Sequence, residues 1–292
     1  MLRESLNNVV IEGILNEVDL EKKVDKNGKT YIGGKITLLV QQVINGVEDE
    51  DIIPINFFQY ELKKDKTLNK NYERLDKFMQ EYQSVASLGG DEAAKQQADR
   101  YNVTGKMEIN TFPSQDGSLV ENPVIRGSFL NKRTKNFTPD SSFETEIMLK
   151  KIVPEVTGED GETGRLLVDG IVVQYNERPD IFHFVVGDAN AVDYINTYWN
   201  TEETVKVEGS IRWTTVQKTV DSTEEVGFGS PKKKVVERTK KEFVITAGSA
   251  ERYPEETAFN LDEMLEALAN KKAENESKMK PKAKAGRADR GF

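Results

Sequence analysis

The sequence has no cysteine and a single histidine, His183, among its 292 residues. Without cysteine it forms no disulfide, iron–sulfur cluster or thiolate zinc site, and it offers no thiol nucleophile. One histidine also excludes a metal site built from several histidines. No apolar run approaches the roughly 18 residues that span a bilayer, and the first ten residues lack the basic and apolar regions of a signal peptide. We therefore expect a cytoplasmic protein with no membrane segment, metal or cofactor.

Motifs of nucleotide-dependent and hydrolytic enzymes are missing as well. The paired glycines at 33–34 and 89–90 and the segment GEDGETG match neither a P-loop, nor a dinucleotide-binding fingerprint, nor a nucleophile elbow. Acidic residues cluster at 48–51 and 159–162, but these segments have the composition of turns and lack the spacing of a calcium loop. The sequence thus predicts a protein that is not an enzyme.

Charge is distributed unevenly along the chain. Overall, 41 Lys and Arg stand against 50 Asp and Glu, a formal net charge of −9. Residues 141–270 carry a net charge of −11, whereas residues 271–292 carry +5. Because that last segment lacks an apolar period and is rich in Lys, Ala and Gly, we expect a disordered basic tail. An acidic body is compatible with nucleic-acid binding, since a groove needs only a local positive stripe.

The first half of the chain has the pattern of five strands and one helix. A β-branched run from Asn7 predicts a strand that bends at Gly13, and the turn sequence 26–29 predicts a hairpin to the next strand. A third strand is expected over 52–60. Apolar residues at helical spacing over 68–82 then predict an amphipathic helix, followed by a polar connector at 87–100. Two further strands, 101–112 and 122–133, complete the unit.

The same order recurs in the second half. Strands are expected over 143–156, 164–175, 180–187, 204–216 and 241–252, with a helix over 191–199. The match is clearest where residues 101–108 align with residues 205–212, each segment containing a central glycine. The chain is therefore predicted to be mainly β, with a first domain over 1–135 and a second over 143–255. The second domain carries a charged insertion at 219–241, and residues 256–292 form a short helix and the tail.

Five short strands with a helix between the third and fourth are the layout of the OB-fold barrel. Three segments sharpen this prediction: residues 8–15 (NVVIEGIL), 180–187 (DIFHFVVG) and 207–213 (VEGSIRW). They resemble the first, third and fourth strands of bacterial and phage single-stranded DNA-binding proteins. The resemblance implies two tandem OB-folds, and it fits a tandem form such as some phages encode. The family's usual acidic tail is replaced here by a basic one that ends in Phe292.

Binding of single strands without sequence preference requires aromatic faces for the bases and cations for the phosphates. Alternation along 55–60 places Ile55 and Phe57 on one face of a strand, and Phe58 and Tyr60 on the other, without deciding which face is core. Trp213 either stacks a base or fills the second barrel. The candidate nucleic-acid-binding residues are Tyr31, Lys35, Phe57, Tyr60, Lys106, Phe112, Arg126, Lys132 and Arg133 in the first barrel, Arg212 and Trp213 in the second, and Lys232, Lys233 and Lys234 in the insertion.

Two segments allow more than one interpretation. The insertion is either a phosphate clamp or a solvated hairpin. The segment 259–273 has an apolar helical face, with Asn260 and Glu263 spaced as a capping box. This helix either packs on the second barrel or, together with the tail to residue 292, docks replication or recombination proteins.

The sequence as a whole predicts a protein that coats and protects single-stranded DNA during phage DNA replication or recombination. Two linked barrels would raise the affinity, because the second binds intramolecularly once the first is engaged. The alternative is a protein-interaction or virion-assembly module built on OB-folds, which the acidic second half favours. A salt-dependent interaction with oligonucleotides would distinguish the two.

Overall fold

The computed structural model describes residues 2–44, 47–114, 118–157, 161–221, 233–250 and 253–279. The side chains of 43–44, 47–48, 215–221, 233–238 and 278–279 are not described. The strands are β1 (Asn7–Val24), β2 (Thr30–Ile44), β3 (Val47–Tyr60), β4 (Arg100–Pro113), β5 (Leu119–Arg133), β6 (Asp140–Thr157), β7 (Gly161–Gln174), β8 (Arg178–Val186), β9 (Thr204–Asp221) and β10 (Lys233–Gly248). The helices are α1 (Lys70–Glu81), α2 (Glu92–Gln97), α3 (Ala189–Tyr198) and α4 (Leu261–Met279), with single 3-10 turns η1 (Ala86–Leu88) and η2 (Tyr175–Glu177).

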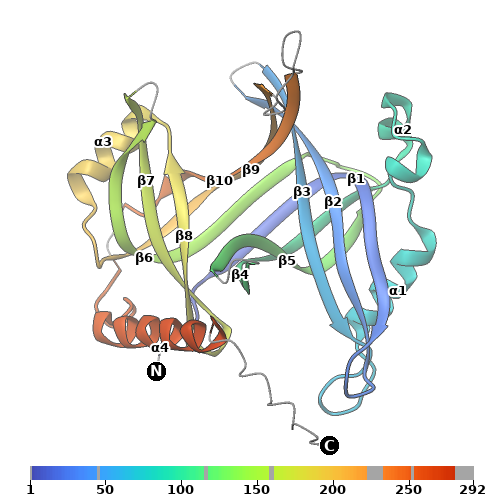
Figure 1. The fold of residues 1–292 in the computed structure, drawn as a ribbon, viewed down its shortest axis with the longest axis horizontal. Helices are drawn as coiled ribbons and strands as arrows, with labels where there is room; N and C mark the ends of the chain where they lie inside the picture. Colours follow the sequence, from blue (N-terminus) through green and yellow to red (C-terminus); the bar gives the residue numbers. More distant parts are fainter. Residues whose placement is uncertain are drawn as a thin grey trace, which may run out of the picture.

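The strands form two five-stranded barrels that stand side by side (Figure 1). The first has the order β2-β3-β5-β4-β1 and closes by pairing β1 with β2, and the second has the order β6-β7-β8-β10-β9 and closes by pairing β6 with β9. In each barrel the third and fifth strands pair in parallel, while the other neighbours are antiparallel. The predicted fold class, mainly β with two tandem OB-folds, is confirmed.

The first hairpin shows how the sequence sets the local geometry. Strands β1 and β2 pair from Val24 and Thr30 onward, around a turn in which Gly28 has a φ of 77°. Residues with a side chain seldom adopt this left-handed backbone conformation, but glycine does so at little cost. The Asp25 carboxylate accepts hydrogen bonds from the backbone N–H groups of Asn27 and Lys29, at 2.8 and 2.9 Å. The hairpin predicted at 26–29 is confirmed.

Two glycines establish the internal repeat at atomic detail. A Cβ on Gly105 would lie 2.2 Å from the carbonyl oxygen of Arg126, and a Cβ on Gly209 would lie 2.0 Å from that of Val244. Both glycines sit where the fourth strand of a barrel crosses the fifth at close approach. This equivalence extends the alignment of 101–108 with 205–212 along the barrel strands.

The barrels are joined by their first strands around a pseudo-two-fold axis. Strands β1 and β6 pair antiparallel, with Val9 opposite Phe143. Val9 also lies opposite Gly105, as Phe143 lies opposite Gly209, so the two central residues are equivalent to each other. The pseudo-two-fold axis therefore exchanges Val9 with Phe143 and each barrel with the other. A contact from a residue of one barrel to the other barrel is expected to recur between the equivalent residues.

The helices close the open ends of the barrels and cover their outer apolar patches. Helix α1 buries Tyr72, Leu75 and Phe78 against the first core. The segment 87–100, expected as a polar connector, instead contains helix α2. Its Ala94, together with Val85 and Ala98, covers Ile14 and Leu39 on the outside of the first barrel. Short helices of this kind lack a long apolar period, which is why the sequence pattern missed α2.

Helix α4 covers the equivalent patch of the second barrel. Met264 and Phe259 pack on Met148 and Ile171, together with Leu2 from the other end of the chain. Asn260 caps the helix, because its side chain accepts the backbone N–H of Glu263 at 3.0 Å. Of the two alternatives for this segment, the structure shows packing on the barrel. No helix in the described part of the chain is long and apolar enough to cross a membrane.

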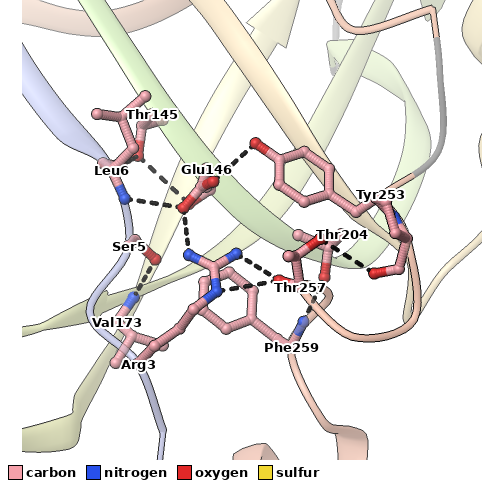
Figure 2. Close-up of polar contacts among 11 residues, drawn as sticks. Arg3, Ser5, Leu6, Thr145, Glu146, Val173, Thr204, Tyr253, Thr257 and Phe259 are labelled. Carbon is pink, nitrogen blue, oxygen red and sulfur yellow. Dashed lines mark hydrogen bonds and ion pairs between the residues drawn. The ribbon is translucent and has the colours of Figure 1, made fainter.

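A polar network fastens the two terminal segments to the second barrel (Figure 2). The Glu146 carboxylate accepts hydrogen bonds from Arg3 at 2.5 Å, from the Tyr253 hydroxyl at 2.7 Å and from the backbone N–H of Leu6 at 3.0 Å. Arg3 also donates to the carbonyl of Thr257 and lies 4.3 Å from the ring of Phe259. Burial together with the hydrogen bond to Glu146 raises the pKa of Tyr253 to about 12.

This network makes the folding stability of the protein fall as the pH becomes acidic. Burial acts to raise the pKa of Glu146, but the hydrogen bonds from Arg3, Leu6 and Tyr253 outweigh it and hold the pKa below the ordinary value of 4.5. Because the unfolded chain then binds the proton more readily, the stabilisation is present above pH 4.5 and is lost as the pH falls through the lower folded-state pKa. We expect Glu146→Gln to weaken the dependence of the melting temperature on pH between about 6 and 3. An unchanged pH profile would contradict this role.

Candidate nucleic-acid interface

Three aromatic rings cluster on the outer face of β2 and β3. Tyr31 pairs across the strands with Tyr60, and Gly33 pairs with Phe58. The ring of Phe58 lies 4.9 Å from that of Tyr31 and 5.0 Å from that of Tyr60, centroid to centroid. Phe58 is 40% exposed. The absence of a side chain at Gly33 leaves room for this aromatic triad, since a Cβ there would lie 3.0 Å from the Tyr31 ring.

Phe57, which was predicted to bind, is part of the core instead. It is 2% exposed, and its ring packs so closely on Gly127 that a Cβ there would lie 2.3 Å away. Successive residues of a strand point to opposite faces, so the burial of Phe57 turns Phe58 outward. The sequence placed Phe58 and Tyr60 on one face but left open which face was core; the exposed phenylalanine is therefore a residue that the list of candidates missed.

A lysine-rich cleft of about 690 Å³ adjoins the triad. Phe58 and Tyr60 line it together with four lysines from the β1–β2 turn and the loop after β3. The hydroxyl of Tyr60 donates to Asp25 at 3.2 Å, which fixes the ring at the mouth of the cleft. Desolvation and this contact with Asp25 raise the pKa of Tyr60, so the phenol stays neutral beside the cations. The lysines are Lys29, Lys63, Lys64 and Lys66.

A row of polar side chains runs from the triad across four strands. Lys35 of β2 pairs with Asn56 of β3, which pairs with Arg126 of β5, which in turn pairs with Lys106 of β4. Residues directly opposite each other share a face, so this cationic row lies on the outside of the first barrel. The side chains of Arg126 and Lys106 are 41% and 43% exposed.

Carboxylates accompany two of these cations. Arg126 lies 3.0 Å from Glu108, and Lys106 is paired with Glu4. An exposed ion pair contributes only about 0 to 1 kcal/mol to stability, so a phosphate can replace the carboxylate at little cost.

The other first-barrel candidates lie apart from the row. Phe112 is 42% exposed near the end of β4. Lys132 pairs with Asp99 at 2.7 Å, and Arg133 pairs with Glu12 at 3.1 Å. Burial of Glu12 is outweighed by hydrogen bonds from the Thr138 backbone, Asn102 and Arg133, which lower the pKa of this carboxyl. The arrangement gives Arg133 a structural contact near the link between the barrels.

Arg212 and Trp213, predicted to bind nucleic acid, lie instead at the junction of the two barrels. Trp213 is 1% exposed, so no base can stack on it in this structure. The side chain of Arg212 is 16% exposed and is paired with Asp49 and, at 2.7 Å, with Asp51 of β3. Arg212 is thus paired with two carboxylates of the first barrel's β2–β3 hairpin. The sequence pattern of the second barrel alone could not predict this contact.

The insertion is described only in part. Lys232 lies outside the described residues, and Lys233 and Lys234 belong to β10 without described side chains. Their backbone pairs with Asp221 and Val220, so the described ends of the insertion continue β9 and β10 as a hairpin. Figure 1 shows this hairpin rising beside that of β2 and β3. Within the described residues no cluster of acidic or histidine side chains could hold a metal ion.

Comparison with known proteins places the chain in a family. The model of a family described as YorF matches residues 5–281, nearly the whole chain. The chain belongs to the YorF family. No curated protein matches its sequence.

Solved structures resemble this YorF chain in fold. The wild-type single-stranded DNA-binding protein of Thermus aquaticus matches with a TM-score of 0.52 and 12% identity, over 86% of this chain and 95% of that one. A deletion mutant of the Thermus aquaticus protein matches with a TM-score of 0.50 and 12% identity, over 87% and 98% of the two chains. The likeness extends over both barrels and supports the fold class.

Proposed function

We propose that this protein binds single-stranded DNA, with little sequence preference, on the outer face of its first barrel. The observation that carries the proposal is the outward-facing aromatic triad, with Phe58 exposed and Tyr31 and Tyr60 half-buried, between a lysine-rich cleft and a cationic row. The similar solved structures, described as single-stranded DNA-binding proteins, support the same function. In this proposal the protein acts by binding and not as an enzyme.

The geometry suits a single strand more than a duplex. Each base that stacks on an aromatic ring contributes about 1 to 3 kcal/mol, and stacking requires a base that is free of its partner. Lysines of the cleft and cations of the row would contact phosphates on either side of the stacked bases. Since every base has an aromatic face and phosphates carry no sequence information, such contacts give affinity with little selectivity.

We propose that the protein acts in DNA replication or recombination, where exposed single strands need protection, and that it is encoded by a phage. Replication or recombination proteins would dock through residues 259–292. Because the apolar face of α4 packs on the second barrel, such a partner would meet its exposed polar side or the basic tail.

Fluorescence anisotropy with an end-labelled oligo-thymidine of about 30 nucleotides, a length that exceeds one OB-fold's footprint, tests the proposal. We expect binding that weakens as salt rises, with an unlabelled duplex competing poorly and an RNA strand measuring the preference for DNA. A labelled oligonucleotide is preferable to tryptophan emission, because Trp199 and Trp213 are 9% and 1% exposed. Absence of any salt-dependent binding would refute the proposal and favour a protein-interaction module.

The lysine-rich cleft allows a separate prediction. Replacing Lys63, Lys64 and Lys66 by Ala should lower the slope of log affinity against log salt, by about 0.7 for each phosphate contact that is lost. All three side chains are exposed, so the melting temperature should change little. Lys150 and Lys151, exposed on β6 of the second barrel, are the matched control, and their replacement should leave the slope unchanged. Equal effects of both sets would show that the cleft is not a specific contact.

A further inference from the structure

The pseudo-two-fold axis identifies the second-barrel counterparts of the cationic row. In the first barrel Asn56 pairs in parallel with Arg126, and in the second Val185 pairs in parallel with Val244. Arg126 lies opposite Lys106, and Val244 lies opposite Ser210. Lys35, opposite Asn56, corresponds to Leu167, opposite Val185. The four counterparts, Leu167, Val185, Val244 and Ser210, carry no charge.

The aromatic triad has no counterpart either. In the first barrel β2 and β3 pair as far as Tyr31 and Tyr60, and the triad lies on this extension. In the second barrel the pairing of β7 with β8 ends at Leu166 and Val186, and the chain enters α3 at Ala189, so the strand pair that would carry a triad is missing. The fold is therefore repeated, but the surface that would bind a strand is not.

The row also changes sign where it crosses the junction of the barrels. Beyond Lys106 the next strands present Asn8 of β1, then Glu144 of β6 and Glu208 of β9, which are in register with one another. These side chains line a groove along the junction. Lys206 is the cation beside them, paired with both carboxylates. A phosphate backbone that continued straight along the row would meet two glutamates.

A different route leaves Lys106 toward the β7–β8 turn. Lys106 also lines a cleft of about 170 Å³ together with Tyr175 and Arg178. Three carboxylates line it as well, but each has a cation of its own: Glu4 pairs with Lys106, Glu108 with Arg126, and Asp180 with Arg178 and Lys271. The two glutamates of the junction groove share the single Lys206. Tyr175 is 70% exposed, more than any other Phe, Tyr or Trp in the described part of the chain. Asn176 and Glu177 follow it with φ values of 59° and 58°, the left-handed pair of a tight hairpin turn.

Hydrogen bonds fix this turn to the first barrel. Gln174 donates to the carbonyl of Met107 at 2.8 Å, and Arg178 donates to the carbonyl of Ile109 at 3.4 Å. Both acceptors belong to β4 and lie on either side of Glu108, close to Lys106 in the same strand. The turn is thereby held beside the end of the cationic row, with the Tyr175 ring free.

We propose that, within the part of the chain that the structure describes, a single strand is bound on one side of the pseudo-two-fold axis, along the first barrel, and reaches the second barrel at the β7–β8 turn. There Tyr175 stacks a base and Arg178 contacts a phosphate. This inference rests on the proposed function and adds to it the path of the strand. The second barrel serves as a support that presents this turn, and a long strand meets more of the protein than a short one.

The test compares the full-length protein with two matched variants on oligo-thymidines of about 8 and about 20 nucleotides, since one OB-fold covers about 4 to 16. Tyr175→Ala should lower the affinity for the long oligonucleotide about 5- to 150-fold and leave that for the short one nearly unchanged. Tyr198→Ala removes another exposed tyrosine of the second barrel, 58% exposed at the end of α3, and should change neither. Binding of the long oligonucleotide by Tyr175→Ala as tightly as by the unmodified protein would overturn the inference.

Charge reversal at equivalent positions tests the one-sided path. Lys106→Glu should weaken binding of both oligonucleotides at least tenfold, whereas Ser210→Glu, at its pseudo-symmetric position, should have no effect. Equal losses for the two variants would show that both barrels bind. Phe58→Ala distinguishes the proposed function from the proposed path. If Phe58→Ala weakens binding while Tyr175→Ala does not, the protein binds single strands as proposed but the path past Tyr175 is wrong. If the unmodified protein binds neither oligonucleotide, both are wrong.

Discussion

Phe58→Ala should lower the affinity for oligo-thymidine by about 1 to 3 kcal/mol, roughly 5- to 150-fold, without unfolding the protein. Its ring stands between those of Tyr31 and Tyr60, at 4.9 and 5.0 Å, and borders the lysine-rich cleft. Removing it takes away a stacking surface and also the support of its two neighbours. Anisotropy titrations at fixed salt measure the loss, and the melting temperature reports whether the fold is intact.

Phe57→Ala is the matched control, because the same side chain is removed one residue earlier. Phe57 is 2% exposed and fills the space over Gly127, so its loss should cost about 3 to 5 kcal/mol of folding free energy. Phe57→Leu retains most of the volume and should fold with near-normal affinity. If the Leu variant loses affinity while Phe58→Ala does not, the assignment of the two faces is wrong.

The contrast between Phe57 and Phe58 shows how much of the candidate site could be predicted from the sequence. Alternation fixed that residues 57 and 58 face opposite ways, and the order of strands and helices indicated two OB-folds. Which face was core depended on Gly127, some 70 positions away along the chain, whose missing side chain admits the Phe57 ring. Local periodicity contains no information on such a contact.

Trp213 illustrates the same limit at a larger scale. Beside an arginine on a barrel strand it had the composition of a stacking site, yet it is 1% exposed. Its strand is covered by the hairpin of the other barrel, and the sequence of one barrel cannot reveal its partner surface. Alternation within a single strand placed Phe58 and Tyr60 on one face, as the structure has them, whereas the contacts of Arg212 and Trp213 at the junction could not be predicted from one strand.

That junction is clamped by two equivalent buried carboxylates. Asp51 of the first barrel accepts the backbone N–H of Trp213 at 2.9 Å, and Asp180 of the second accepts the backbone N–H of Ile109 at 3.3 Å. Asp51 and Asp180 occupy equivalent positions of β3 and β8, and they are 1% and 2% exposed. Asp51 also holds Arg212 at 2.7 Å and the Thr214 hydroxyl at 3.1 Å, so one carboxylate satisfies three donors.

Asp51→Ala should therefore destabilise the protein by about 3 to 5 kcal/mol, the cost of leaving a largely buried arginine and a buried N–H without their acceptor. That is a large share of the about 5 to 15 kcal/mol that holds a typical domain folded. Urea denaturation measures the loss as a lower midpoint. Asp49→Ala is the control, because Asp49 also pairs with Arg212 but its side chain is 36% exposed, so less than about 1 kcal/mol should be lost. Equal midpoints for the two variants would show that the clamp does not depend on the buried carboxylate. A selective loss at Asp51 would explain why Arg212, a cation on an OB-fold strand, is committed to holding the barrels together and is not available to a phosphate.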